Sequence, residues 1–164
     1  MNYKILTSRE KKRVLQRIQE QWGCKTDEIE DFIFLLTGKL DLYFATREIF
    51  DIDIKKLHLN SMGLYFADLR ENAPRLSIEG SQLIGPIAKK NVIDVEEREG
   101  INWLKGSDIE LKEGKQEGLS DYIIVRCGED FMGCGKYKPE EKKILNFIPK
   151  SRRLAIAALM DEED

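Results

Sequence analysis

The stretch "YIIVRCGEDFMGCGKYKPEEKKILNFIPKSRRL", residues 122–154, joins a clear strand signal to a dense run of basic residues. Its alternating β-branched residues predict a strand over 121–127. "GED" predicts a turn, and "FMGCGKY" and "ILNFIP" predict a second and a third strand. The stretch therefore predicts a small β-structure that carries Lys and Arg side chains.

The residues just before this stretch extend the same structure. "NVIDV" at 91–95 predicts a strand, and "EEREGINWLKG" at 96–106 predicts a helix with Trp103 and Leu104 on its buried side. "SDIELKEG" at 107–114 predicts a loop with a short strand. Short strands at close spacing around one helix predict a small barrel that the helix caps.

The amino-terminal half predicts a small α/β domain around one sheet. Thr7 and Glu10 match a capping box at the start of a helix, and Gly23 fits the left-handed position at its end. Two aromatic-rich runs around "TGK" predict a β-hairpin. "KKLHLNSMGLYFADL" and "RLSI" predict further strands, and "EGSQLIGPIAKKN" predicts a short helix that ends near Gly85.

No low-complexity linker separates the two halves, so we expect them to pack together. The expected fold is α+β, with a small α/β domain at residues 1–90 packed against a β-barrel domain at residues 91–164.

The composition indicates a globular protein outside the membrane. The chain has 164 residues, of which 41% are hydrophobic and 35% are charged. No apolar run approaches the ~18 residues that a spanning helix needs, and the first residues lack the pattern of a signal peptide. We therefore expect a cytoplasmic protein with no membrane partner.

No pattern of a metal centre or of a catalytic site is present. Cys24, Cys127 and Cys134 are an odd number at scattered spacings, and His58 is the single histidine. There is no G-x-S-x-G, no P-loop and no acid–base pair that stands out. We expect no metal, no cofactor, no catalytic residue and no enzyme activity.

The net charge of −3 hides a strong local asymmetry. Residues 1–25 contain seven Lys and Arg against two acids, and residues 126–153 contain eight against four. The centre and the tail "MDEED" are acidic. The basic ends are either ordinary solvated faces or a local positive field that attracts a polyanion.

Two glycines and two cysteines of the predicted hairpin have structural and functional interpretations. Gly133 and Gly135 share one face of a strand, which admits close approach of a ligand or of another part of the barrel. Cys127 and Cys134 lie on adjacent strands, but no base marks either one as a nucleophile. We expect both to be small buried residues.

The basic residues of this half come with aromatic neighbours, Tyr137 and Phe147. Cations beside aromatic rings suit RNA, which offers both phosphates and unpaired bases. The basic residues are Arg126, Lys136, Lys138, Lys142, Lys143, Lys150, Arg152 and Arg153.

These motifs resemble the PUA-like RNA-binding domain at the C-terminus of Sun-family RNA 5-methylcytosine methyltransferases. There a V-R strand, a G-x-G-K strand and an N-x-x-P-K-x-x-R ending recur, as does a G-A-D-V-x-x-P-G segment. The matching residues are Val125, Arg126, Gly133, Gly135, Lys136, Asn146, Pro149, Lys150, Arg153, Gly106, Asp108, Ile109 and Gly114. Lys112 and Glu113 depart from the last pattern. The layout of the whole chain is also similar to two-domain ribosome-biogenesis factors that carry an α/β domain before a PUA domain.

The resemblance implies a barrel that binds RNA without the methyltransferase chemistry, because residues 1–90 do not match that catalytic domain. It implies a non-catalytic protein acting on structured rRNA or tRNA in ribosome biogenesis or RNA modification. The expected RNA-binding residues are Trp103, Lys105, Gly106, Arg126, Gly133, Gly135, Lys136, Lys138, Lys150, Arg152 and Arg153. The alternatives are an adaptor that docks on a ribosome-assembly protein or RNA methyltransferase, and a small enzyme that modifies RNA or a nucleotide.

Overall fold

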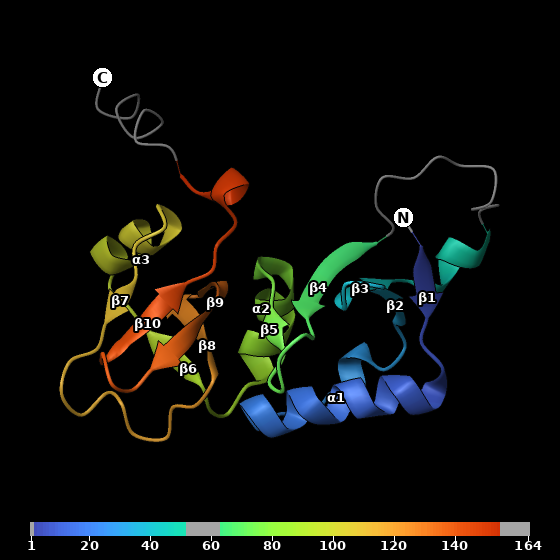
Figure 1. Cartoon of the computed structure of the whole chain (residues 1–164), viewed down its shortest axis with the longest axis horizontal. Helices are drawn as coiled ribbons and strands as arrows, with labels where there is room; N and C mark the ends of the chain where they lie inside the picture. Colours follow the sequence, from blue (N-terminus) through green and yellow to red (C-terminus); the bar gives the residue numbers. More distant parts are fainter. Residues whose placement is uncertain (1, 52–62, 155–164) are drawn as a thin grey trace.

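The computed structural model describes residues 2–51 and 63–154, which form two five-stranded sheets with helices beside and between them (Figure 1). This mixture confirms the α+β class. The first sheet contains, in spatial order, β1 (Tyr3–Ile5), β2 (Ile33–Thr37), β3 (Asp41–Ala45), β4 (Leu64–Asp68) and β5 (Arg75–Leu76). The second contains β6 (Val92–Asp94), β8 (Tyr122–Cys127), β9 (Asp130–Lys138), β10 (Lys143–Asn146) and β7 (Ile109–Glu110). The α-helices are α1 (Ser8–Trp22), α2 (Ile78–Ile84) and α3 (Glu97–Leu104), and the 3₁₀ helices are η1 (Asp27–Ile29), η2 (Arg47–Asp51), η4 (Gly85–Ile87) and η5 (Lys150–Arg152).

Helix α1 begins and ends where the sequence predicts. Thr7 accepts a hydrogen bond from the N–H of Glu10 (3.3 Å), and the Glu10 carboxylate accepts one from the N–H of Thr7 (2.8 Å). Gly23 follows with a φ of 61°, a left-handed conformation that suits glycine. The buried face of α1, which includes Ile18 and Trp22, packs on the first sheet.

The first sheet is antiparallel throughout. The predicted hairpin around "TGK" is confirmed as β2 and β3, whereas β1 is a strand that the sequence did not predict. Phe34, Phe44 and Phe66 project from one face into the core that α1 covers. The predicted strand "RLSI" ends early, because the Ser77 hydroxyl accepts a hydrogen bond from the N–H of Gly80 (2.9 Å) and starts α2 there.

The second sheet curls around the side chain of Trp103 but is not a closed ladder. Strand β6 pairs in parallel with β8, and the remaining pairs are antiparallel. Among the described residues, β6 and β7 are the two edges, and α3 connects one edge to the other. The expected barrel is therefore a curled, open sheet, and Trp103 of α3 is buried in its core. The Trp103 indole is fully buried, and its N–H donates to the carbonyl of Met132 (2.8 Å).

A β-bulge in β9 explains why position 133 is a glycine. Ile124 pairs with Cys134 and Arg126 with Phe131, so two residues of β9 face one residue of β8. Gly133 lies in this bulge with a φ of 85°, which a residue with a side chain would adopt only under strain.

Helix α2 is wedged between the two sheets (Figure 1). A β-carbon on Gly80 would lie 2.3 Å from the carbonyl oxygen of Phe66 in β4, and one on Gly85 would overlap the ring of Phe131 in β9. Between them, the Ser81 hydroxyl accepts a hydrogen bond from the N–H of Gly133 (2.9 Å). Small residues on both sides of α2 therefore let the two sheets approach closely.

Buried polar residues form a second contact between the two halves, in addition to the contact made by α2. The Gln21 amide donates to the carbonyls of Ser120 (2.7 Å) and Tyr122 (2.9 Å). The Asn91 amide donates to the carbonyl of Gln21 (2.6 Å) and accepts from the N–H of Ser120 (2.9 Å). Each of these polar groups is satisfied inside the protein, which favours a single orientation of the halves.

The expected division at residues 90 and 91 falls between η4 and β6, and it stays a prediction. Tyr122, Ile124 and Cys134 of the second sheet share one core with α1 and the first sheet. Positions 55–62 of the predicted strand "KKLHLNSMGLYFADL" lie outside the described residues. In the part of the chain that is described, no helix has the length and apolar character needed to cross a bilayer.

We predict that Ser81→Ala lowers the free energy of unfolding by about 1–3 kcal/mol, because it leaves the buried N–H of Gly133 without an acceptor. Urea denaturation measures this change. Gln82→Ala, at an exposed position of the same helix, is the matched control and should change stability by less than about 0.5 kcal/mol. Equal effects of the two variants would contradict the role of Ser81.

Candidate nucleic-acid interface

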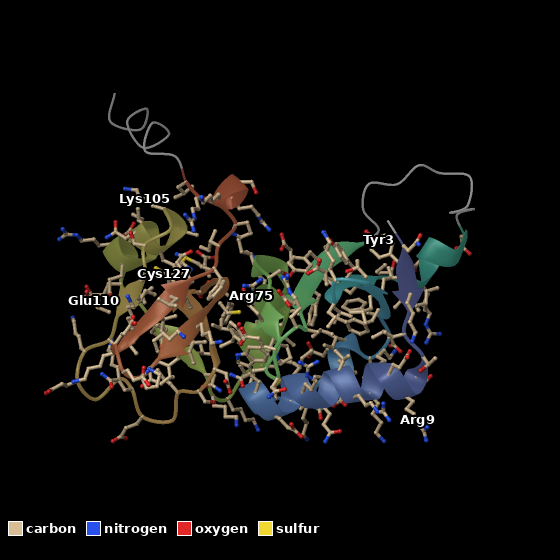
Figure 2. All side chains as sticks on the ribbon, viewed as in Figure 1. Tyr3, Arg9, Arg75, Lys105, Glu110 and Cys127 are labelled. Atoms are coloured by element: carbon tan, nitrogen blue, oxygen red, sulfur yellow. The ribbon has the colours of Figure 1, made fainter. Side chains whose placement is uncertain are left out.

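Four cations lie on two chain segments that meet at the carboxyl end of α3, and one of them, Arg152, extends from there to Glu79 at the start of α2. The chain after β10 returns to this end, where the N–H of Leu154 donates to the carbonyl of Leu104 (3.0 Å). We call the group the terminal basic cluster, and its members are Lys105, Lys150, Arg152 and Arg153. Positive charge is favourable beside the free carbonyls of a helix end. Figure 2 shows Lys105 at the outer end of α3.

Gly106 and Asn146 position this cluster. A β-carbon on Gly106 would lie 2.7 Å from Nε of Arg153, so the guanidinium would have to shift, and the φ of 105° itself favours glycine here. Nε of Arg153 donates to the carbonyl of Ile148 (3.1 Å). The Asn146 amide donates to the carbonyls of Trp103 (2.7 Å) and Ser107 (3.0 Å), which ties the end of α3 to the last residue of β10.

Three of the predicted RNA-binding cations already pair with carboxylates of the protein. Arg126 binds Asp94 through two hydrogen bonds, and Lys136 donates to Glu71 (2.6 Å). The hydrogen bond from Arg126 lowers the pKa of Asp94, and the hydrogen bond from Lys136 lowers that of Glu71. Arg152 binds Glu79. A phosphate group would have to compete with these carboxylates.

The other predicted RNA-binding cations form no such pair. Within the described ranges, no ion pair involves Lys105, Lys138, Lys150 or Arg153. Their charge is available to a phosphate group.

The predicted RNA-binding cations of β8 and β9 do not lie side by side on the second sheet. Lys136 is opposite Tyr122, whereas Arg126 lies four residues further along β8, about 13 Å away at the usual rise of a strand. Arg126 is beside β6, and Lys136 and Lys138 are at the other end of β9. The structure therefore brings Gly106 and Arg153 into contact and places Lys105, Lys150 and Arg152 on the same two segments, whereas Arg126, Lys136 and Lys138 lie on strands of the second sheet.

Three further predicted residues lie in the core. Trp103, Gly133 and Gly135 are buried. A β-carbon on Gly135 would lie 2.6 Å from the Trp103 ring, so this glycine makes room for the indole. Each of the three has a packing role inside the protein.

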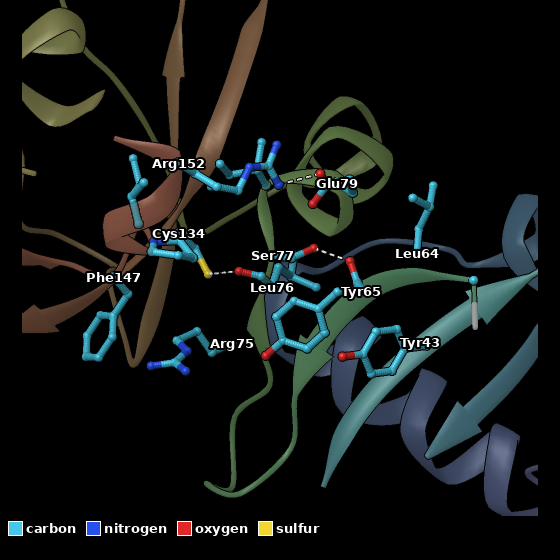
Figure 3. Close-up of a pocket in the computed structure, with 15 residues that line it drawn as sticks. Tyr43, Leu64, Tyr65, Arg75, Leu76, Ser77, Glu79, Cys134, Phe147 and Arg152 are labelled. Carbon is cyan, nitrogen blue, oxygen red and sulfur yellow. Dashed lines mark hydrogen bonds and ion pairs between the residues drawn. The ribbon is translucent and has the colours of Figure 1, made fainter. Parts of the chain in front are cut away.

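A cavity of about 360 Å³ lies between the two sheets at the start of α2 (Figure 3). The first sheet contributes Tyr43, Tyr65 and Arg75, and the segment after β10 contributes Phe147 and Arg152. Figure 3 shows Arg75 between Phe147 and Tyr65, with the Arg152–Glu79 pair on the other side.

Rings and cations follow one another along this cavity. The ring centroids of Tyr43 and Tyr65 are 5.4 Å apart, and Cζ of Arg75 lies 4.6 Å from the centroid of the Phe147 ring. Phe147 also meets the Tyr122 ring edge-on at 6.1 Å. Burial, followed by the charges of nearby carboxylates, raises the pKa of Tyr65 to about 12, so its hydroxyl is a neutral hydrogen-bonding group at pH 7.

Sequence reasoning did not identify Tyr43, Tyr65 and Arg75. A signal for the tyrosines was present, because "LYFA" occurs at 42–45 and again at 64–67. In each copy the phenylalanine is buried and the tyrosine is on the opposite face, which is the two-residue period of a strand. The two strands pair antiparallel, with Tyr43 opposite Tyr65.

Cys134 lines the cavity but is not an activated nucleophile. Its thiol lies 3.1 Å from the carbonyl of Leu76, and burial raises its pKa to about 12. The thiol is therefore protonated at neutral pH. Among the described residues, no group of three or more His, Cys, Asp and Glu side chains is placed to hold a metal ion.

Comparison with protein families gives a match to the Methyltransferase RsmF PUA domain over residues 90–154. A comparison with curated proteins gives no match. The carboxyl-terminal part of the chain is thus a PUA-like domain of the type found in Sun-family methyltransferases, as the sequence predicts. A PUA domain suggests RNA binding in RNA modification. The match covers less than half of the chain.

We predict that an aqueous thiol reagent modifies Cys127 in the native protein and leaves Cys134 intact. Cys127 is partly exposed, whereas Cys134 is buried and its pKa is raised by burial. Mass spectrometry after brief exposure identifies the modified residue. The same reaction in urea, where every cysteine is accessible, is the control. Modification of Cys134 in the native protein at the same rate as Cys127 would contradict the burial of the Cys134 side chain.

Proposed function

We propose that this chain is a non-catalytic RNA-binding protein that acts on rRNA or tRNA in RNA modification or ribosome biogenesis. The observation that carries the proposal is the terminal basic cluster, which the PUA-like domain holds at the end of α3. In this account Lys105, Lys150 and Arg153 contact phosphate groups of a structured RNA. Arg152 joins them when a phosphate group replaces Glu79.

The electrostatics of the chain support a local contact rather than attraction by net charge. The protein carries a formal charge of −3, so at long range it repels RNA. At physiological ionic strength, charges more than about 8 Å apart are largely screened from each other. A compact group of cations therefore attracts phosphates even on an acidic protein.

The state of Cys134 argues against one kind of catalysis in the cavity, attack by a cysteine nucleophile. A cysteine nucleophile attacks as the thiolate, and burial raises the pKa of the Cys134 thiol, which keeps it protonated. As part of the proposal, we assign the chemistry of modification to a separate enzyme. The chain would present the RNA to that enzyme or to an assembly factor.

We predict that Lys105→Ala/Lys150→Ala weakens the binding of rRNA or tRNA fragments. It should also reduce the log–log salt slope of binding by about 1.4 to 1.8, because each phosphate contact contributes about 0.7 to 0.9. Fluorescence anisotropy across a range of salt concentrations measures both quantities. Neither residue forms an ion pair within the described part of the chain, so their loss leaves no carboxylate unpaired there.

Lys12→Ala/Arg13→Ala is the matched control. It removes the same charge from two exposed positions of α1, and its RNA binding should show the same salt slope as that of the wild type. If both double variants weaken binding equally, the terminal basic cluster is not the contact. If neither double variant weakens RNA binding, and the protein still binds a partner protein after nuclease treatment, it is an adaptor that binds protein.

A further inference from the structure

We propose that the cavity between the two sheets receives one unpaired nucleobase, which stacks on Tyr65, Arg75 and Phe147. This inference rests on the proposed RNA binding and goes beyond it, because it gives the amino-terminal half a direct part in recognition. The PUA-like domain supplies Phe147 and Arg152, and the first sheet supplies Tyr43, Tyr65 and Arg75.

The size and openness to solvent of the cavity suit such a ligand. Its volume of about 360 Å³ is at the lower end of the range of small-molecule sites, roughly 300–1,000 Å³. Of the five large apolar side chains that are exposed in the described ranges, two line this cavity, Leu64 (55% exposed) and Phe147 (37%). Exposed apolar surface around a cavity indicates a binding site.

The flat surfaces point to an aromatic ligand. A guanidinium over a ring and a pair of tyrosines offer faces on which a planar base stacks without regard to its identity. Arg75 is held in this orientation by a hydrogen bond from Nη2 to Oδ2 of Asp68 (2.9 Å). The stacking surface therefore exists before a ligand binds.

Hydrogen-bonding groups on the opposite wall match the edge of a base. Arg152 has only donors and Glu79 has only acceptors, and both line the cavity. Arg152 also belongs to the terminal basic cluster. An RNA strand whose phosphates lie on that cluster would therefore reach the cavity with its next nucleotides.

The base must be unpaired, because stacking against protein rings requires a base that has left the helix. The inference therefore separates single-stranded from double-stranded RNA. Replacing a ring by an aliphatic side chain distinguishes stacking from simple apolar contact, because the aliphatic side chain fills space without offering a ring face.

The test compares Phe147→Ala with the wild type for binding of a short labelled single-stranded RNA and of the same sequence as a duplex. One lost stacking partner should weaken single-strand binding by about 5- to 140-fold and leave duplex binding unchanged. Phe147→Tyr should retain the affinity. Tyr65→Leu, in the other half of the protein, should weaken single-strand binding in the same way while keeping an apolar side chain.

Leu154→Ala is the control, because Leu154 is similarly exposed (40%) and does not line the cavity. Lys105→Ala/Lys150→Ala tests the proposed function in the same assay. If it weakens binding while Phe147→Ala and Tyr65→Leu bind as the wild type, the cavity is not a base site and the proposed function stands. If Phe147→Ala weakens duplex binding equally, stacking of an unpaired base is refuted. If the wild type binds neither RNA, both proposals fail.

Discussion

The position of α2 between the two sheets is the constraint on which the rest of the structure depends. Gly80 lets the helix touch the backbone of β4, and Gly85 accommodates the ring of Phe131 from β9. Ser81 then accepts the hydrogen bond of the bulge residue Gly133. Because α2 is held on both sides, the residues at its start meet the segment after β10 at a fixed distance. The cavity between the sheets is a consequence of this packing.

Local features of the fold could be predicted from the sequence, because neighbouring residues determine them. The capping box of Thr7 and Glu10, the hairpin of β2 and β3, and the strands β8 and β9 all follow from short patterns. Strand β1 carries no such pattern, since three residues are too few to show a period. The β-bulge at Gly133 was hidden because it depends on the register between two strands.

The sequence predicts which types of residue form the site, but not how these residues are arranged in space. The sequence identified the basic residues of the PUA-like domain, and their role in RNA binding stays a prediction; the family match supports the domain that carries them. It could not show that Lys136 pairs with Glu71 or Arg152 with Glu79, because each partner lies more than sixty residues away in the chain. Ion pairs of this kind decide which cations are free for a phosphate, and they exist only once the two halves have packed.

The central claim is that RNA contacts the terminal basic cluster and the adjoining cavity. Ultraviolet crosslinking of the protein to a bound rRNA or tRNA fragment, followed by mass spectrometry of the crosslinked peptides, tests it most directly. The account predicts adducts on peptides that contain Lys105 and residues 147–153, with a further adduct at Tyr65 when the RNA has an unpaired segment. Adducts confined to α1, on the opposite face of the first sheet, would contradict it.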